Sequence, residues 1–383
     1  MSLQNFALPI SIGQLQIPNR MLLAPLAGVS DAPFRRICQE MGAGLTYVEM
    51  LSATAILHGN KRTFQMMYRH ESEKILGVQV TGSTAEQVSK AVAILHAEGF
   101  DTIDINMGCP VRKVVTAGCG SAILKDPPRV SETVAMARIQ TNRPLSAKFR
   151  LGYTRDAINV ADTAARVVQS GVDMFTIHGR TRSESYGTPV DIAGIQQGFL
   201  SGLAQVPATE LGAKGPVAVG NGDIFKYTDA LRMSAEANSD AVMVSRGALG
   251  NPWLFKEIAL GKTYSPLPGE WLEVVLRHIQ YHRELYGETR MAAVLARKHL
   301  LWYCKGFPGT KALREQFNTL ESLADVETIL TAFVGNLPTD LPRFHQGHFA
   351  GAQPDAPEFS YDPKYEMDRT HDRGVGDVDL GNE

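Results

Sequence analysis

Cys109 is the first residue whose surroundings could support chemistry, and it lies in the stretch TIDINMGCPVRKVVTAGCGSAIL. The β-branched start of this stretch predicts a strand, which the Gly and Pro flanking the cysteine must end. The thiol is therefore expected on a turn at a strand end. Arg112 and Lys113 follow it closely, and cations favour the thiolate or a readily donated thiol proton. The alternative is a cysteine that packs as a small hydrophobic side chain.

Lys148 is the second anomaly, because it interrupts an otherwise apolar predicted strand. A lysine there must extend its ammonium group to solvent or face a partner charge. It could form a Schiff base, or it could be a fixed cation that holds an electron-rich cofactor. Gln79 and Asn106, on neighbouring predicted strands, offer donors and acceptors that suit a flavin ring better than an aldolase's sugar. His178 could reach the same ring or a phosphate, or could be a structural histidine.

Two glycine-containing turns follow the last two predicted strands. They are NGD at 221–223 and SRGALGN at 245–251. Each offers backbone amides, the second adds an arginine, and a helix start follows, which together suit an anion. Glycine turns after strands also occur for geometric reasons alone. As a pair on neighbouring strands, the turns indicate a ligand that carries a phosphate.

The elements that must position these residues are eight short apolar strands that alternate with helical patterns. The predicted strands lie at 21–29, 45–50, 75–82, from 102, and at 144–152, 174–181, 215–223 and 240–249. This number and rhythm predict a TIM (β/α)8 barrel, whose active site lies at the carboxyl ends of its strands. An open doubly wound sheet is the alternative, but it would usually show GxGxxG after its first strand, and none is present there.

The helical part after the barrel is expected to be a separate small domain. We predict a barrel over 1–262, an all-helical domain over 263–341 and a disordered acidic tail over 342–383. Between residues 270 and 320, eight Lys and Arg residues stand against five Glu residues. Arg290 and Arg297 are seven residues apart, as are Lys298 and Lys305, which puts each pair on one side of a helix. This surface either contacts RNA or is an ordinary solvated face.

The totals of the chain exclude several classes of protein. A net charge of −2 over 383 residues gives no general argument for nucleic-acid binding. The four cysteines have no CxxC spacing, so we expect neither disulfides nor a metal site. The N-terminus lacks the features of a signal peptide, and the uncharged run 192–209 is too polar to span a membrane. A cytoplasmic, monomeric protein is expected.

Taken together, these segments resemble a known family. The motifs are APLAGVSDAPFR, EMGAGLTYVEM, GVQVTGS, DINMGCPVRKVV with GCGSAIL, SAKFRLG, IHGRTR, VGNGDI, VMVSRGALGNPWLF and ARKHLLWY. From about residue 17 to about residue 333 they resemble the bacterial tRNA-dihydrouridine synthases, most closely the B-type branch. The resemblance implies an FMN-containing barrel and a helical tRNA-binding domain. In such enzymes NADPH, or NADH, reduces the flavin, which reduces C6 of a flipped uracil while a cysteine protonates C5.

The resemblance also implies a role for each matching residue. Cys109 would be the general acid. FMN would be bound by Pro25, Leu26, Ala27, Gln79, Lys148, His178, Asn221, Gly222, Asp223, Ser245 and Arg246. The tRNA would be contacted by Asn106, Arg112, Lys113, Arg180, Arg290, Arg297 and Lys298. The B-type match suggests a uridine of the D-loop, at position 17.

Two other functions are compatible with parts of the sequence. A flavin barrel resembling dihydroorotate or dihydropyrimidine dehydrogenases would act on a free base, but such chemistry has no need of the basic helical domain. A non-catalytic tRNA-binding protein would contain no flavin at all.

Overall fold

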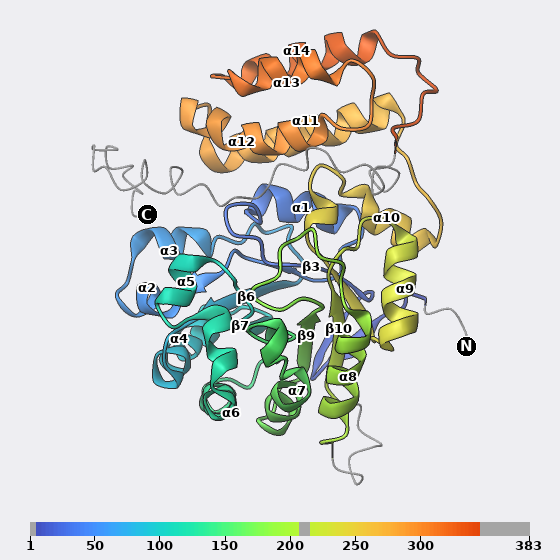
Figure 1. Cartoon of the computed structure of the whole chain (residues 1–383). Helices are drawn as coiled ribbons and strands as arrows, with labels where there is room; N and C mark the ends of the chain where they lie inside the picture. The colour runs from blue at the N-terminus through green and yellow to red at the C-terminus, as the bar shows by residue number, and fades with distance from the viewer. Residues whose placement is uncertain (1–4, 207–214, 345–383) are drawn as a thin grey trace. The chain divides into compact units, whose positions relative to one another are not determined.

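The computed structural model describes residues 5–206 and 215–344, which belong to one compact unit (Figure 1). Its strands are β1 (Ile10–Ile12), β2 (Leu15–Ile17), β3 (Met21–Leu23), β4 (Thr46–Tyr47), β5 (Leu51–Ser52), β6 (Leu76–Thr81), β7 (Thr102–Met107), β8 (Leu145–Arg150), β9 (Met174–His178), β10 (Val217–Asn221) and β11 (Ala241–Val244). Its α-helices are α1 (Ala32–Glu40), α2 (Ala53–Leu57), α3 (Lys61–Met66), α4 (Ala85–Ala97), α5 (Arg112–Thr116), α6 (Pro127–Arg138), α7 (Val160–Gln169), α8 (Ile192–Leu203), α9 (Tyr227–Ala237), α10 (Trp253–Leu260), α11 (Pro268–Tyr286), α12 (Arg290–Tyr303), α13 (Thr310–Asn318) and α14 (Ala324–Gly335).

The central sheet confirms the predicted barrel. Its strands pair in parallel in the order β3-β11-β10-β9-β8-β7-β6-β4. A parallel bridge between Leu22 and Leu45 joins the first and last strands of that order, so the sheet comes close to closing on itself. Each of the eight predicted strands contributes one strand to this ring, which is the arrangement of a TIM barrel.

Several of the helices around the sheet begin at a capping side chain. The Asp31 side chain accepts a hydrogen bond from the Phe34 amide at 3.2 Å and starts α1, and Thr84 caps α4 in the same way. Consecutive helices pack on one another along the sheet, from α4 to α6, α7, α8 and α9. The sequence therefore encodes both the strands and the starts of the helices that cover them.

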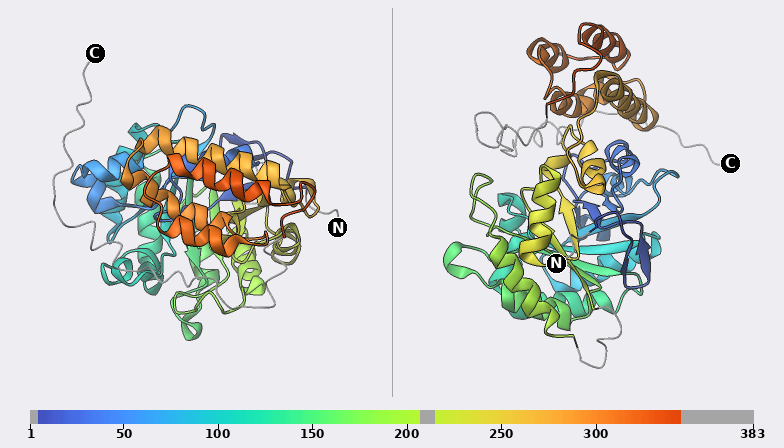
Figure 2. Two further views of the ribbon diagram at one scale, coloured as in Figure 1. Left: turned by 90° about the horizontal axis from the view of Figure 1, so that it is seen from above. Right: turned by 90° about the vertical axis from the view of Figure 1, so that its right-hand side faces the viewer.

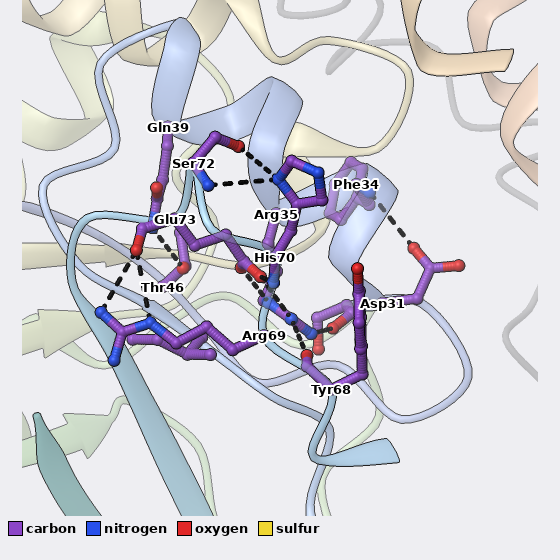
Figure 3. Close-up of polar contacts among 12 residues, drawn as sticks. Asp31, Phe34, Arg35, Gln39, Thr46, Tyr68, Arg69, His70, Ser72 and Glu73 are labelled. Atoms are coloured by element: carbon purple, nitrogen blue, oxygen red, sulfur yellow. Dashed lines mark hydrogen bonds and ion pairs between the residues drawn. The ribbon is translucent and has the colours of Figure 1, made fainter. Parts of the chain in front are cut away.

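A buried ion pair holds α1 against the loop before β6. The Arg35 guanidinium contacts both carboxylate oxygens of Glu73, at 2.6 and 2.9 Å, and both side chains are almost fully buried (Figure 3). Arg35 also donates to the carbonyls of Ser30 and Tyr68, each at 2.8 Å. The direction of α1 and the position of its first residues are consequently fixed.

The hairpin β1–β2 was not predicted. Ile10, Ile12 and Ile17 pack with Met174 and Val217, which begin β9 and β10. The hairpin therefore covers the amino ends of the strands with apolar side chains. The polar groups lie at the opposite, carboxyl ends of the strands, which the hairpin does not cover.

The chain after the barrel is helical, as predicted. α11 to α14 share an apolar core that includes Trp271, Phe317 and Leu330, and α11 packs on α1 (Figures 1 and 2). The predicted boundary at residue 262 falls between α10 and α11. Most of the predicted acidic tail, from residue 345, lies outside the described residues. Within the described part of the chain, no helix combines the length and apolar character needed to cross a membrane.

Candidate active site

Several polar residues share the inner face of the barrel near the carboxyl ends of its strands. The strand register and the alternation of side chains put them on one face: Asn106, Lys148, Arg150, His178 and Asn221. The outer face is marked by Ile177, whose side chain lies against Gly198 of α8. The strands therefore bring together residues that are up to 115 positions apart in the sequence.

Lys148 faces an amide rather than a carboxylate. Its ammonium group donates to the Asn221 side-chain oxygen at 2.8 Å. Asn221 in turn donates to the Met243 carbonyl at 2.7 Å and to the Ser245 hydroxyl at 3.1 Å. Burial and the positive charge of Arg150 lower the pKa of Lys148 to about 8. The lysine is thus a cation whose charge has no direct anionic partner among its described hydrogen bonds, as expected of a group that meets an anionic ligand.

A directed chain of hydrogen bonds leads from Asp104 to the cysteine turn. Asp104 accepts from Ser146 at 2.6 Å and from the Gln79 amide nitrogen at 2.7 Å. The Gln79 oxygen accepts from the Asn106 nitrogen at 2.9 Å, and the Asn106 oxygen accepts from the Cys109 amide at 2.9 Å. Burial raises the pKa of Asp104 to about 6. The acceptor-only carboxylate at one end fixes how both amides are turned.

The chain of hydrogen bonds ends at the Cys109 backbone amide, and the thiol of the same residue keeps its proton. Burial raises the pKa of the thiol, although the Val111 amide and the charges of Arg150 and Lys148 partly offset that effect. The Cys109 carbonyl accepts from the amide and the hydroxyl of Ser121, at 3.1 and 2.9 Å. The thiol is therefore available as a proton donor at neutral pH rather than as a thiolate.

The cations near the thiol differ from those expected. Arg112 and Lys113 are exposed on α5, which follows the cysteine turn. Arg150, which the sequence analysis did not single out, donates to the Gly108 carbonyl at 2.8 Å and to the Thr181 carbonyl at 2.8 Å. It therefore holds the residue before Cys109, and its charge acts on the thiol from inside the barrel.

Asp223 links two arginines at the rim. One carboxylate oxygen contacts Arg180 and the other contacts Arg246 at 2.9 Å. Arg180 is 1% exposed and also donates to the Thr188 carbonyl at 2.6 Å. Burial, together with the positive charges of Arg150 and Lys148, holds the pKa of His178 well below its ordinary value, so this imidazole is neutral. One carboxylate between two guanidinium groups leaves this part of the rim positively charged.

The loop after β3 completes the predicted cofactor set. Pro25, Leu26 and Ala27 are partly or fully exposed there. The next residue, Gly28, accepts a hydrogen bond from the Lys298 ammonium group of α12 and donates its amide to the Glu49 carboxylate. The loop is thus held from two sides, by α12 and by the segment after β4.

Comparison with known proteins identifies the family. The family model described as dihydrouridine synthase matches residues 22–337. The tRNA-dihydrouridine synthase B of Pasteurella multocida is 35% identical over 314 residues, which is 81% of this chain and 91% of that protein. The probable tRNA-dihydrouridine synthase 1 of Synechocystis is 34% identical over 335 residues, or 85% of this chain and 89% of that protein.

The chain belongs to the dihydrouridine synthase family. Among solved structures, histamine dehydrogenase from Rhizobium sp. 4-9 matches with a TM-score of 0.52 at 12% identity, over 72% of this chain and 51% of that one. A 2-naphthoyl-CoA reductase matches with a TM-score of 0.51 at 13% identity, over 68% and 52%. At such low identity these two matches support the barrel fold alone.

The predicted RNA-contacting cations of this dihydrouridine synthase have different surroundings. Arg290 is exposed and pairs with Glu321 at 2.9 Å. Arg297 is half-buried and donates to the Leu320 carbonyl at 2.8 Å, and Lys298 contacts the loop after β3. Of these three residues of the helical part, Arg290 is consequently the one whose side chain is presented to solvent.

Proposed function

We propose that this dihydrouridine synthase reduces a uridine of tRNA to 5,6-dihydrouridine, using FMN and a nicotinamide reductant, NADPH or NADH. The main observation behind the proposal is that Cys109 lies at the same strand ends as Lys148 and the amides of Gln79 and Asn221. The relatives at 32–35% identity whose printed names are tRNA-dihydrouridine synthase B support the same reaction. We also propose a D-loop uridine, position 17, as the target.

The chemistry of the donor groups fits FMN. Lys148 offers a positive charge without a carboxylate partner in its described hydrogen bonds. The amides of Gln79 and Asn221 already bond to neighbouring residues, but each keeps capacity for one further hydrogen bond to a heterocycle. Arg246 shares the Asp223 carboxylate with a second arginine, Arg180, so this part of the rim keeps a positive charge that lets Arg246 bind a phosphate. When bound, FMN would supply the hydride that reduces the C5–C6 double bond of uracil. The proposed FMN-binding set is that given by the motifs: Pro25, Leu26, Ala27, Gln79, Lys148, His178, Asn221, Gly222, Asp223, Ser245 and Arg246.

Cys109 would supply the second hydrogen. Addition of hydride at C6 leaves negative charge on C5 and O4, and the thiol transfers its proton to C5. The sulfur then carries the negative charge, which the nearby cations Arg150 and Lys148 stabilise until solvent returns a proton. The uracil gains one hydride and one proton, so the step is balanced. The raised pKa of the thiol supports this role because the proton is present before the reaction.

The RNA would be held by phosphate contacts outside the barrel. A uridine within folded tRNA must be turned out of its stack to reach a site inside a barrel. The exposed cations Arg112, Lys113 and Arg290 are suited to backbone contacts, which position RNA without reading its sequence. We also propose Asn106 and Arg180 close to the base, and Arg297 and Lys298 as supports of the RNA-binding surface.

The sharpest test compares two cysteines of similar exposure. Cys109→Ala, loaded with FMN, should lose about 100-fold or more in dihydrouridine formation in unmodified tRNA while oxidation of NADPH in the absence of tRNA stays unchanged. Cys119→Ala is the matched control and should retain the wild-type rate, because Cys119 donates only a weak 3.6 Å contact to the Ala117 carbonyl. Wild-type dihydrouridine formation by Cys109→Ala would refute the role of Cys109. Turnover of free uracil or orotate as fast as of tRNA would favour the free-base reaction instead.

A further inference from the structure

Four buried residues converge where α1 meets the helical part of the chain. Asp31 is the N-cap of α1, His278 and His282 lie one turn apart on α11, and His299 lies on α12. One ligand-type atom from each of the four lies within 4.8 Å of the other three. The histidines are 1%, 0% and 2% exposed, in that order. No step of the proposed reaction uses them.

The imidazole nitrogens that face one another lack hydrogen-bond partners. Among the described residues, Nε2 of His278, Nε2 of His299 and both ring nitrogens of His282 are buried without one. A buried polar atom that is left unpaired costs about 1–3 kcal/mol, so several in one place require an explanation. An ion that accepts one lone pair from each of the three imidazoles would remove most of this cost and would leave only one N–H of His282 without a partner.

Residues outside the cluster hold the side chains of His278 and Asp31 in place, as they usually do for metal ligands. The Tyr303 hydroxyl lies 3.1 Å from Nδ1 of His278, and the Tyr286 hydroxyl donates to one oxygen of Asp31 at 3.1 Å. The other Asp31 oxygen accepts from the Phe34 amide, and Figure 3 shows the carboxylate directed away from the Arg35 network. Such second contacts fix the orientation of ligands around a metal ion.

The protonation states are those that a metal requires. Burial lowers the pKa of His278 to about 3 and also lowers the pKa values of His282 and His299, so the three imidazoles are neutral. At neutral pH the cluster therefore offers three neutral imidazoles and one carboxylate.

We propose that Asp31, His278, His282 and His299 bind a divalent transition-metal ion, best matched by Zn²⁺, which fastens α1 of the barrel to α11 and α12. Three nitrogens and one oxygen make a set suited to zinc rather than to Mg²⁺ or Ca²⁺, which prefer oxygen ligands. Two histidines four residues apart on one helix commonly supply two of the ligands of a zinc site. With four protein ligands the site is closed, so its role is structural.

The distances agree with tetrahedral coordination after a small contraction. Bonds of about 2.1 Å to a tetrahedral zinc ion place its ligand atoms about 3.4 Å apart. Nε2 of His282 and the Asp31 oxygen are already 3.6 Å apart. The remaining separations, up to 4.8 Å, require shifts of roughly 1 Å, which side-chain rotations can provide. Lys298 lies near the cluster and weakens it electrostatically, but its ammonium group is held on the Gly28 carbonyl.

The competing explanation is a metal-free stack of aromatic rings. The ring centroids of His278 and His299 are 4.7 Å apart, and those of His282 and His299 are 5.5 Å apart. Ring contacts alone would stabilise neutral imidazoles, but they would leave the buried nitrogens unpaired. The two explanations differ in metal content, which can be measured directly.

The first experiment measures metal in the full chain, produced without a histidine tag in medium that contains zinc, iron and manganese. After dialysis against EDTA at moderate concentration, mass spectrometry should find about one zinc ion per chain. Replacement by Co²⁺ should give the intense visible absorption of tetrahedral cobalt. The proposal is overturned if the wild-type chain holds less than about a tenth of an equivalent and binds neither Zn²⁺ nor Co²⁺ when they are added.

Variants and melting temperatures complete the test. His282→Ala should lose the metal, whereas His96→Ala, at a half-buried histidine that bonds to Thr141 elsewhere in the barrel, should retain it. Because His282→Ala could fail to fold, zinc is also removed from the wild type with a strong chelator and then returned. Its return should raise the melting temperature by on the order of 10 °C. Full zinc content in His282→Ala, or an unchanged melting temperature, would contradict the proposal whether or not the protein reduces uridine.

Discussion

The hydrogen-bond chain from Asp104 to Cys109 has a direction that substitution can reverse. In the wild type every junction joins one donor to one acceptor, through Gln79 and Asn106. Asn106→Asp keeps the size of the side chain and its acceptor for the Cys109 amide, but removes its donor. Whichever way the Gln79 amide is turned, one pair of buried acceptors must then face each other.

The expected cost follows from that single mismatch. One hydrogen bond is lost and two buried acceptors face each other, which together costs about 2–4 kcal/mol of unfolding free energy. For a chain of this size such a loss lowers the melting temperature by roughly 2–5 °C. Asp104→Asn should cost no more than this, because its new amide nitrogen either faces the Gln79 nitrogen or donates to the Ser146 hydroxyl, which then loses its own acceptor.

The double variant Asp104→Asn/Asn106→Asp should restore most of the stability. The new amide at 104 accepts from Ser146 and donates to Gln79, Gln79 turns over, and the new carboxylate at 106 accepts from Gln79 and from the Cys109 amide. All junctions are again paired, in the opposite direction. The coupling energy in this double-mutant cycle should therefore be about 2 kcal/mol or more in favour of the pair.

Low pH should also restore stability to the Asn106→Asp variant, because it lets Asp104 act as a donor. The pKa of Asp104 is already about 6, and a second carboxylate nearby raises it further. Protonated Asp104 can donate to a turned Gln79, so the deficit of this variant should shrink as the pH falls from 8 to below 6. The sign follows because the native variant then binds a proton that its unfolded chain, with a pKa near 3.9, does not bind at that pH.

The assay is thermal unfolding followed by circular dichroism for the wild type, both single variants and the double variant, at pH 8 and at pH 5.5. Matching far-ultraviolet spectra at low temperature would establish that all four fold alike. If the double variant is destabilised by the sum of the two single effects, or if the Asn106→Asp deficit does not change with pH, the directed chain does not exist as described.

Three further outcomes test other parts of the structure. The dissociation constant of FMN should rise about tenfold per pH unit above 8 as Lys148 loses its proton, and Lys148→Arg should remove that dependence in equilibrium titrations. Glu73→Ala should lower the free energy of unfolding by about 3–5 kcal/mol because it leaves a buried arginine unpaired, whereas the exposed Glu71→Ala should change it little. Gly250→Ala should destabilise far more than Gly261→Ala, since both have positive φ but only at 250 would a new carbon lie 2.3 Å from the backbone of α12.

The barrel and its rim could be predicted because both depend on local patterns. The strands are short apolar runs ended by Gly, Pro or Asn, and alternation alone places Lys148 and Asn221 on the same inner face. The same alternation places Arg150, two residues after Lys148, on the inner face as well, so Arg150 could also have been predicted from the sequence. Asp104 could be found in the same way, two residues before Asn106.

The partners of the long side chains could not be predicted in the same way. The spacing of Arg290 and Arg297 predicts that both lie on one side of a helix. It does not predict that Arg290 reaches solvent while Arg297 donates to the Leu320 carbonyl. A side chain with several rotatable bonds can reach many partners, and the choice depends on residues far away in the sequence. For Lys298 that partner, Gly28, lies 270 positions earlier.

The histidine cluster shows the same limit for metal sites. The spacing of the cysteines predicts no metal site, and His278 and His282 alone are only half of a ligand set. The third and fourth residues, His299 and Asp31, join them only because α1 and α12 both pack on α11. Asp31 lies six residues after Pro25, at the end of the loop that Lys298 also holds. The helical part of the chain therefore contacts the proposed cofactor loop at two points, Gly28 and Asp31, so that loosening α11 and α12 should also loosen the residues proposed to bind FMN.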